Sequence, residues 1–469
     1  MSDTAPSALP PGPPLPLIAQ SALMLRYGLG FLTGCQRRYG NVFTVREPLK
    51  GTVVYVAAPA DIKTVFAGDP RVFHAGEANS MLGGLLGSNS LFVLDEDEHR
   101  DRRRLMVPAF HRDAVARKID QMTEIVAANI AGWPVGQSFP AEAKMTEITL
   151  EVILRTVIGA TDPARLAALR DVIPRLLYLK PWETPAIAKP DLRRHRPWRA
   201  LDRRFAEADA VLNAEIAERR ADPELADRTD ALAMLIRAAH DDGRTMNDRE
   251  LRDQLMTLIA AGHETTASSL SWALERLIRH PEVLAKAVRA ANASAQGDSA
   301  GDEYLDAVAR ETLRVRPVIF SAARFLTEPV EVGGYRLPAG VTVNLAIGLV
   351  HHDGALFPEP GRFDPERMIG TTLAPNTYIP FGGGNRRCLG ATFAMSEMHV
   401  VLREILRRVE LCTTSAPDEK RKLKHLTFVP HLGARLEVRA FREVAPAAPA
   451  SGCPAGTHGA AESNDSAPR

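Results

Sequence analysis

Cys388 closes a loop that is rich in glycine and arginine, PFGGGNRRCLG, from Pro380 to Gly390. Three consecutive glycines bring no packing side chain and lose much backbone entropy on folding, so some other group must approach this backbone closely. The helix predicted to begin directly after the loop favours a thiolate through its amide groups and its dipole, and Arg386 and Arg387 add positive charge. A glycine-rich turn with an inert cysteine is the alternative. A phosphate-binding loop is disfavoured because neither Lys-Ser nor Lys-Thr follows the glycines.

A second group of polar residues interrupts an otherwise apolar helical segment, LMTLIAAGHETTASSLSWALERLI, at residues 255–278. Gly262, Glu264 and Thr265 all stabilise a helix less than Ala or Leu does, and Gly costs about 1 kcal/mol relative to Ala. Residues that weaken a helix in its middle usually mark function, while a polar kink or a water-facing side is the alternative. The zinc-protease pattern H-E-x-x-H also begins here, but Ala267 stands where the second histidine is required.

Two further pairs place polar side chains on one side of a predicted helix. Glu311 and Arg314 are at positions i and i+3, and His99 and Arg103 are at i and i+4. These separations bring helical side chains within reach of each other. Alone they indicate little, because most such pairs are solvated surface contacts worth under about 1 kcal/mol. His99 lies in the charged run DEDEHRDRRR, so a solvated side chain is its alternative interpretation.

The cysteine loop resembles the haem-binding loop of the cytochrome P450 family. The shared pattern is F-x-x-G-x-R-x-C-x-G, and its fixed residues in this sequence are Phe381, Gly384, Arg386, Cys388 and Gly390. The resemblance implies that these residues bind haem b, with Cys388 as the axial thiolate that favours O–O cleavage. It also implies that Arg386 pairs with a haem propionate.

The segment AGHETT resembles the family signature A-G-x-[DE]-T-[TS], which belongs to the long helix above the haem. By this resemblance Ala261 contacts the haem. Thr265 and Glu264 would be the catalytic residues, because Thr265 would donate a hydrogen bond to the activated oxygen and Glu264 would relay protons toward it.

The segments around the charged pairs also have counterparts in the family. EYLDAVARETLRVRP resembles its E-x-x-R helix, and PEPGRFDPERM resembles the segment that supplies a further arginine. The resemblance implies a structural triad of Glu311, Arg314 and Arg367. This triad would brace the core on the side of the haem loop and would take no direct part in catalysis.

The two propionates of a buried haem need cationic or hydrogen-bond-donating partners. His99 and Arg103 resemble the propionate-binding helix of the family, in which many members have Trp at the first position. Arg324, in the segment SAARFLTEPVEVGGYRLPAG, resembles the arginine that reaches the same carboxylates from the sheet. The resemblance thus implies that all three residues bind the cofactor.

The hydrophobic periodicity predicts a mainly α-helical protein with a small β region. The predicted helices span residues 113–131, 142–158, 201–220, 248–279, 282–292, 303–315 and 391–410. Extended segments near Val53, from Val330 and from His425 carry β-branched residues and Gly or Pro punctuation, which is typical of hairpins. The resemblance implies the cytochrome P450 fold, a single large domain at residues 15–443 between disordered tails at 1–14 and 444–469.

Charge and composition exclude several classes of protein. The 58 Lys and Arg almost cancel the 57 Asp and Glu, so no nucleic-acid partner is expected. The four cysteines lie far apart without a C-x-x-C pair, which argues against a disulfide framework or a zinc ribbon. Pro16, Gln20 and Arg26 interrupt the apolar stretch at 15–32, so no transmembrane anchor is expected. We expect a cytoplasmic monomer, with peripheral membrane contact as the alternative.

The expected activity is that of a haem-thiolate monooxygenase, which inserts one oxygen atom from O2 into an apolar small molecule of the fatty-acid, terpenoid or steroid type. By resemblance its pocket is lined by segments 72–94, 173–200, 255–261, 318–323 and 428–429. Direct use of peroxide is one alternative, which the pair of Glu264 and Thr265 disfavours. A haem-binding sensor or carrier without turnover is another.

No flavin or iron–sulfur segment is left over in the sequence, so a separate ferredoxin with its reductase is expected to supply the electrons. A positive patch would attract this acidic partner. Six arginines lie in the two segments that approach the haem, namely Arg102, Arg103, Arg104, Arg112, Arg386 and Arg387. Because propionates would occupy Arg103 and Arg386, the other four would form the patch. The alternative is that these arginines pair with the acidic residues between positions 95 and 101 and attract nothing.

Overall fold

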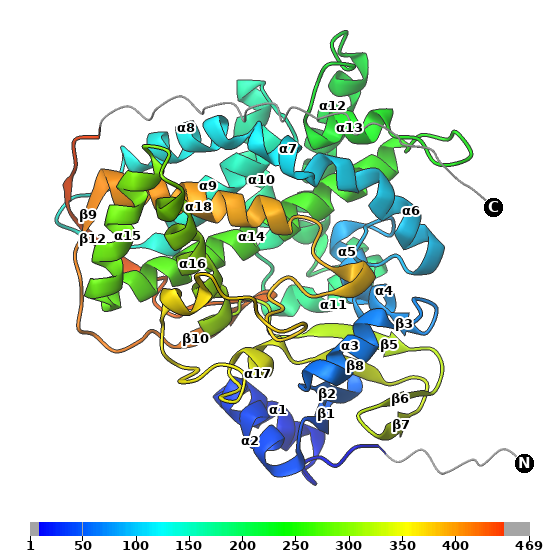
Figure 1. Ribbon diagram of the computed structural model, residues 1–469. Coiled ribbons are helices and arrows are strands. Elements are labelled where there is room, and N and C mark those ends of the chain that lie inside the picture. The colour runs from blue at the N-terminus through cyan, green and yellow to red at the C-terminus, as the bar shows by residue number, and fades with distance from the viewer. Residues whose placement is uncertain (1–8, 49, 445–469) are drawn as a thin grey trace, which may run out of the picture.

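The computed structural model describes residues 9–48 and 50–444. Figure 1 shows a mainly helical body with a smaller β-rich part at its lower edge, beside the first two helices. The predicted fold class, mainly α with a small β region, is confirmed. Most of the two predicted tails lies outside the described residues, as does Cys453. Residues 10 and 11 do pack, because Thr44 donates hydrogen bonds to the carbonyls of Pro10 and Pro11.

The helices account for most of the described chain. In its first half they are α1 (Leu17–Tyr27), α2 (Leu29–Tyr39), α3 (Pro59–Ala67), α4 (Ala75–Ala78), α5 (Gly83–Leu86), α6 (Glu96–Met106), α7 (Arg112–Ala116), α8 (Ile119–Ile130), α9 (Ala141–Val152), α10 (Pro163–Leu177), α11 (Thr184–Ala188), α12 (Arg199–Ala221) and α13 (Ala231–Arg237). In its second half they are α14 (Asp248–Arg279), α15 (Pro281–Ser294), α16 (Ser299–Val315), α17 (Ile347–His351) and α18 (Ala391–Arg408). A π-helical turn, Ile153–Val157, continues α9.

The largest sheet has five strands in the order β1-β2-β8-β5-β3, in which only the β2–β8 pair is parallel. Its strands are β1 (Val42–Glu47), β2 (Gly51–Val56), β3 (Phe73–His74), β5 (Ala322–Leu326) and β8 (Thr342–Leu345). Alternate residues of β2 pack into different clusters, since Val54 contacts the cluster of α3 while Val53 and Tyr55 contact that of α2. The sheet is therefore covered on both faces.

Three small sheets complete the β region. They are formed by β4 (Ser138–Pro140), β12 (Arg435–Phe441) and β9 (Val409–Leu411), by β10 (Arg421–Lys424) and β11 (Thr427–Pro430), and by β6 (Val330–Val332) and β7 (Tyr335–Leu337). The hairpin prediction is right for residues 330–337. The predicted segment from His425 instead supplies β11 and β12 to two different sheets.

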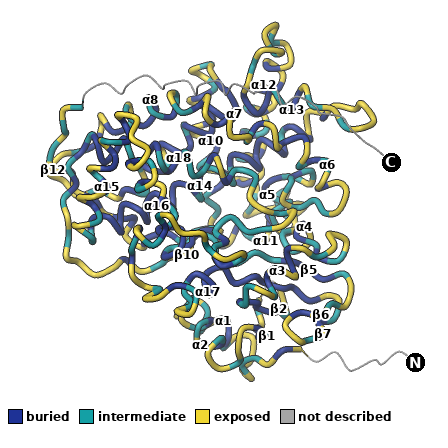
Figure 2. The backbone as a smooth tube through the Cα atoms, viewed as in Figure 1, coloured by how far each residue is buried: buried dark blue, intermediate teal, exposed yellow. Residues whose placement is uncertain are grey.

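Helix α14 runs through the centre of the helical body. It begins in a capping box, in which Asn247 accepts a hydrogen bond from the Glu250 amide and Glu250 accepts one from the Asn247 amide. Most of its residues are buried (Figure 2). Ala260, Ala261, Glu264 and Thr265 are exceptions, because they are only partly buried and lie on one side of the helix. On this side, the open side of α14, the middle of the helix is only partly covered by protein.

Candidate active site

The Cys388 loop is held in shape by its own backbone and by α3. The Cys388 amide donates to the Phe381 carbonyl at 2.9 Å, and the Arg387 amide donates to Gly384. A Cβ atom on Gly383 would collide with the ring of Phe66, and one on Gly384 would collide with the Phe66 carbonyl. A close approach to the glycines is thus present, but it comes from this chain's own Phe66, so packing does explain these two glycines.

The electrostatic surroundings of the Cys388 sulfur are mixed. Cys388 is exposed as a whole residue, yet its sulfur is crowded by protein, and burial raises the pKa of its thiol. A hydrogen bond from the Gly390 amide and the charges of Arg103 and Arg387 lower that pKa, but not enough to offset burial. The amide and the arginine charge thus act in the direction that the sequence predicts, but burial outweighs them. A positively charged metal at the sulfur would be needed to keep it ionised.

Four basic side chains from distant parts of the sequence converge beside this loop. Burial lowers the pKa of His99 to about 3, and the charges of Arg386, Arg103 and Arg324 lower it further. His99 is therefore neutral and acts as a hydrogen-bond donor or acceptor. It lies on α6 with Arg103, while Arg324 comes from β5 and Arg386 from the cysteine loop.

This cluster has more positive than negative charge. Arg386 forms an ion pair with Asp95 at 2.5 Å, whereas neither Arg103 nor Arg324 pairs with a carboxylate among the described residues. Burial lowers the pKa of Arg324 to about 10, and the nearby Arg386 adds to this effect. Because Arg324 is only 5% exposed, its charge is expensive without an anion. The cluster is therefore suited to bind carboxylates.

The open side of α14 carries the two predicted catalytic residues. The Thr265 hydroxyl donates to the Ala261 carbonyl at 2.7 Å. The Glu264 carboxylate accepts a hydrogen bond from Thr427 at 2.9 Å and lies 3.2 Å from the ring of His425. Glu264 thus has a fixed position, set by the β10–β11 turn.

Glu311, Arg314 and Arg367 come together as the resemblance implies. Arg314 donates two hydrogen bonds to the Glu311 carboxylate, both at 2.8 Å, and Arg367 donates one at 3.1 Å. Arg314 also donates to the carbonyls of His351, Pro360 and Arg362. Glu311 and Arg314 are fully buried, so the network ties α16 to the chain before the cysteine loop.

The predicted positive patch is smaller than expected. Arg102 is buried and pairs with Glu250, and Arg104 pairs with Asp241. Arg386 is engaged by Asp95, one of the acidic residues that the alternative interpretation named. Arg112 and Arg387 remain exposed and form no ion pair with a described carboxylate.

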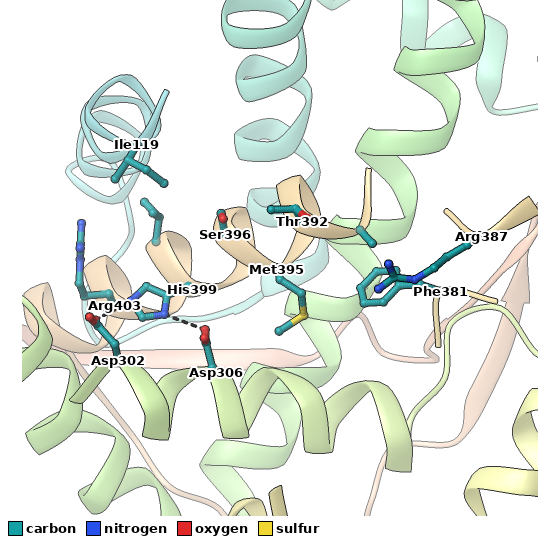
Figure 3. A pocket seen from close by; sticks show the side chains of 12 residues that line it. Ile119, Asp302, Asp306, Phe381, Arg387, Thr392, Met395, Ser396, His399 and Arg403 are labelled. Atoms are coloured by element: carbon teal, nitrogen blue, oxygen red, sulfur yellow. Dashed lines mark hydrogen bonds and ion pairs between the residues drawn. The ribbon is translucent and has the colours of Figure 1, made fainter. Parts of the chain in front are cut away.

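A groove of about 540 Å³ runs along α18 beside the Cys388 loop (Figure 3). It is lined by Ile119, Asp302, Asp306, Phe381, Arg387, Ala391, Thr392, Met395, Ser396, His399, Val400 and Arg403. Arg387 and Phe381 lie at one end of it, and His399 lies between Asp302 and Asp306 at the other. The side of the cysteine loop that faces α18 is thus hollowed and open to the surface.

Several residues of the site carry no signal in the sequence. Asp95 holds Arg386, Phe66 fills the space over the glycines, and His425 and Thr427 hold Glu264. The last two lie 161 and 163 residues from Glu264 in the chain. No local spacing can indicate contacts at such separations.

The arrangement has the parts that a haem-thiolate centre needs, and the comparisons with known proteins agree. The sequence profile described as Cytochrome P450 matches residues 10–436. The chain belongs to the cytochrome P450 family. It is 66% identical over 463 residues to the putative cytochrome P450 135B1 of Mycobacterium tuberculosis and of Mycobacterium bovis, which covers 98% of each chain.

Other members are more distant but span most of the chain. The putative cytochrome P450 135A1 of Mycobacterium tuberculosis is 41% identical, over 93% of this chain and 97% of the relative. The haem domain of cytochrome P450DA is 26% identical with a TM-score of 0.79, over 94% of this chain and 99% of that one. A cyanobacterial cytochrome P450 with bound retinoic acid is 26% identical with a TM-score of 0.77, over 92% and 99%.

Cytochromes P450 are haem b monooxygenases, and the residues of this chain fit the cofactor. Burial raises the pKa of the Cys388 thiol despite the charges of Arg103 and Arg387. In the buried cluster of Arg103, Arg324 and Arg386, the one carboxylate that forms an ion pair among the described residues is Asp95, on Arg386. A cofactor with one metal ion and two carboxylates would supply positive charge to the Cys388 sulfur and negative charge to the arginine cluster. None of the helices in the described ranges is both long and apolar enough to cross a lipid bilayer.

Proposed function

We propose that this chain inserts one atom of O2 into a C–H bond of an apolar small molecule, of the fatty-acid, terpenoid or steroid type. The observation that carries the proposal is the charge pattern of the site. Three arginines lie near a neutral, buried histidine with one ion-paired carboxylate, Asp95, among the described residues. Arg103 also acts on the Cys388 sulfur, whose thiol pKa is raised by burial. A cofactor with two carboxylates and a thiolate-binding metal complements this pattern.

In this proposal the Cys388 thiolate would bind the haem iron, and the bound haem would supply the activation of O2. Phe381, Gly384 and Gly390 shape the loop around the cysteine, with the Gly390 amide donating a hydrogen bond to the sulfur. That bond reduces the charge on the sulfur and keeps it oriented.

The propionates are assigned to the basic cluster. Arg103, Arg324 and Arg386 offer guanidinium groups, and His99 offers a ring N–H from the same buried space. Ala261, on the open side of α14, presents a small side chain that leaves room for a flat ligand. Glu311, Arg314 and Arg367 brace the chain before the loop and do not reach the reacting atoms.

Proton delivery is assigned to Thr265 and Glu264. The Thr265 hydroxyl donates to the Ala261 carbonyl, so its oxygen lone pairs remain available to accept a hydrogen bond from a water molecule. Glu264 is 14% exposed at its side chain and contacts His425, whose side chain is 21% exposed. A proton can therefore pass from solvent to His425, to Glu264 and on toward Thr265.

The substrate class rests on the apolar character of the lining segments. Leu255, Met256 and Ile259 on α14 are buried, and Phe320 packs edge-on against Phe428 with their ring centroids 5.8 Å apart. These apolar side chains belong to the segments that the resemblance assigns to the substrate pocket. The cyanobacterial relative whose structure contains bound retinoic acid supports this class.

We assign the supply of electrons to a ferredoxin and its reductase. The ferredoxin would dock at the groove along α18. This groove reaches the cysteine loop at Phe381 and Arg387, so it offers a short path to the ligand. The protein would work as a cytoplasmic monomer without a nucleic-acid partner.

The proposal is tested by turnover with isotopically labelled dioxygen. Purified holoenzyme, ferredoxin, reductase and a panel of apolar compounds are incubated under labelled O2. One labelled oxygen atom in the product and one in water are expected. Product that forms only when peroxide is added, and that carries no label from O2, would favour a peroxygenase. Haem binding without any product across the panel would favour a sensor or carrier.

A further inference from the structure

The outward side of α1 is apolar. Ile18 and Leu25 are 83% and 86% exposed, the highest values among the large hydrophobic residues of the described chain. They are seven residues apart and therefore lie on the same side of the helix, with exposed Ala22 between them. Tyr27, at the end of the helix, is 61% exposed. Soluble proteins seldom leave such side chains together in water.

The side of α1 that faces the protein is fixed mainly by a polar residue. Gln20 is the one buried residue of this helix. Its side-chain amide donates to the carbonyls of Pro13 and Leu15 and accepts a hydrogen bond from the Arg46 amide. Met24 packs partly against the cluster of α2, but the apolar side chains of Ile18 and Leu25 contribute nothing to this anchoring. The usual arrangement of a surface helix, apolar side inward, is thus largely inverted.

The charges around this surface have one sign. Between Asp3 and Glu47 the sequence contains no acidic residue. Arg26, Arg37 and Arg38 are all exposed, and none of them forms an ion pair with a carboxylate among residues 9–48 and 50–444.

Other exposed arginines of this chain do pair with carboxylates. Arg71 binds Asp69, Arg100 binds Asp97 and Arg439 binds Glu410. Exposed arginines without an ion pair to a described carboxylate also occur elsewhere, at Arg112 and Arg387, so what distinguishes the α1–α2 region is that its sequence contains no acidic residue at all.

Helices α1 and α2 lie side by side beneath the five-stranded sheet, at the opposite end of the molecule from α8 and α12 (Figure 1). Arg37 and Arg38 lie in the last turn of α2. This region is thus a protruding edge that can meet a flat surface without involving the groove along α18.

We propose that α1 and α2 form a docking surface for an anionic lipid bilayer. Ile18, Ala22 and Leu25 would insert among the headgroups and upper acyl chains, and Arg26, Arg37 and Arg38 would neutralise lipid phosphates. Apolar contact and basic charge together are what peripheral helices use to bind membranes, and each basic side chain adds about 1 kcal/mol near an anionic surface. The contact is peripheral and leaves the catalytic machinery unchanged, so it stands or falls independently of the proposed reaction.

The test is sedimentation of the full-length holoenzyme with vesicles. One set contains phosphatidylcholine alone, and the other contains phosphatidylcholine mixed with phosphatidylglycerol. The wild type is expected to sediment with the anionic vesicles and to be released by salt. Leu25→Asp and Ile18→Asp should each lower the partition coefficient about tenfold. In each variant an apolar side chain that would insert into the bilayer is replaced by a negative charge that lipid phosphates repel.

The control variant is Val135→Asp, which adds the same charge at an exposed apolar position in the loop before β4. It should bind vesicles like the wild type. The double variant Arg37→Glu with Arg38→Glu should bind anionic vesicles more weakly while keeping the absorption spectrum of the folded holoenzyme. The proposal is overturned if Leu25→Asp and Ile18→Asp sediment like Val135→Asp. It is also overturned if gel filtration shows a wild-type dimer that Leu25→Asp dissociates, since a second copy would then be the occupant.

Discussion

At the scale of single residues, the chemical groups of the site could be predicted from the sequence, but what holds them in place could not. Cys388, Thr265 and Glu264 stand out because their types break local rules for a loop or a helix. The residues that hold Glu264 in place have no such unusual features. His425 lies in the β10–β11 turn and Thr427 at the start of β11, and only folding brings them to Glu264.

Thr265→Ala is expected to separate oxygen consumption from product formation. Ala suits a helix at least as well as Thr, so folding and substrate binding should persist. Without the hydroxyl, proton delivery should fail often, and the fraction of electrons recovered in product should fall about tenfold or more as peroxide is released. The measurement is product and peroxide formed per electron donor oxidised.

Ser269→Ala is the matched control for this prediction. The Ser269 hydroxyl donates to the Thr265 carbonyl at 2.8 Å, one turn further along α14, and the residue is buried. Its removal breaks the same kind of bond without touching the open side of the helix. If both variants couple oxygen uptake to product like the wild type, Thr265 has no role in proton delivery.

At the scale of elements, the sequence predicts α14 to the residue, while other elements differ. The predicted helix 113–131 is divided into α7 and α8 with a break at residues 117 and 118. Helix α10 was not predicted at all, because Pro174 lies inside it and proline usually ends a helix. It is tolerated near the end of α10, where one lost backbone hydrogen bond matters less than the packing of Val172, Ile173 and Leu176.

His399 links α18 to α16 and makes this contact dependent on pH. Its ring lies 2.9 Å from Asp306 and 3.2 Å from Asp302, beside Ser294 and near Arg403. These partners outweigh burial and raise the pKa of His399 to about 8.

A histidine whose pKa is raised by folding stabilises the protein fully below its unfolded value of about 6.5, and that stabilisation is lost as the pH rises through about 8. The free energy of unfolding should therefore fall by up to about 2 kcal/mol between pH 6 and pH 9. Denaturant unfolding over this range measures it. His399→Asn should be less stable at pH 6 and should lack most of this decline; an equal decline in both proteins would contradict the assignment.

Gly384→Ala tests the packing of the cysteine loop on α3. Gly384 has a φ of +64°, and a Cβ atom there would collide with the Phe66 carbonyl. The left-handed backbone geometry and the collision together should lower the free energy of unfolding by about 2 kcal/mol or more. They should also reduce the amount of haem that the protein retains. Gly354→Ala has open space around its Cβ position and serves as the control. Equal stability and haem content in both variants would exclude the proposed packing role.

At the scale of the whole molecule, net charge conceals how charge is distributed. The sequence predicts six arginines near the cysteine loop, yet Arg102, Arg104 and Arg386 face carboxylates that only the fold brings near. What remains for a partner protein is Arg387, which lines the groove, and Arg112, which is exposed at the start of α7. Pairing of this kind is decided by tertiary structure and cannot be read from charge spacing alone.

Arg112→Glu combined with Arg387→Glu should slow the first electron transfer from an acidic ferredoxin by at least about tenfold at low ionic strength. Added salt should reduce the difference in rate between the double variant and the wild type, because exposed charges are screened over about 8 Å at physiological ionic strength. Stopped-flow reduction under carbon monoxide measures the rate. Arg194→Glu, in an exposed pair with Asp191 away from the groove, is the control. Rates that respond neither to salt nor to the double reversal would contradict docking at the groove.

The central claim is that the Cys388 thiolate ligates haem iron, and the spectrum of the reduced carbon-monoxide complex tests it most directly. Thiolate ligation gives ferrous haem a long-wavelength absorption band with carbon monoxide that other ligands do not give. The wild type should show this band, and Cys388→Ser and Cys388→Ala should lose it, whereas Cys412→Ala, at a partly exposed cysteine next to β9, should keep it. Survival of the band in Cys388→Ala would contradict the account.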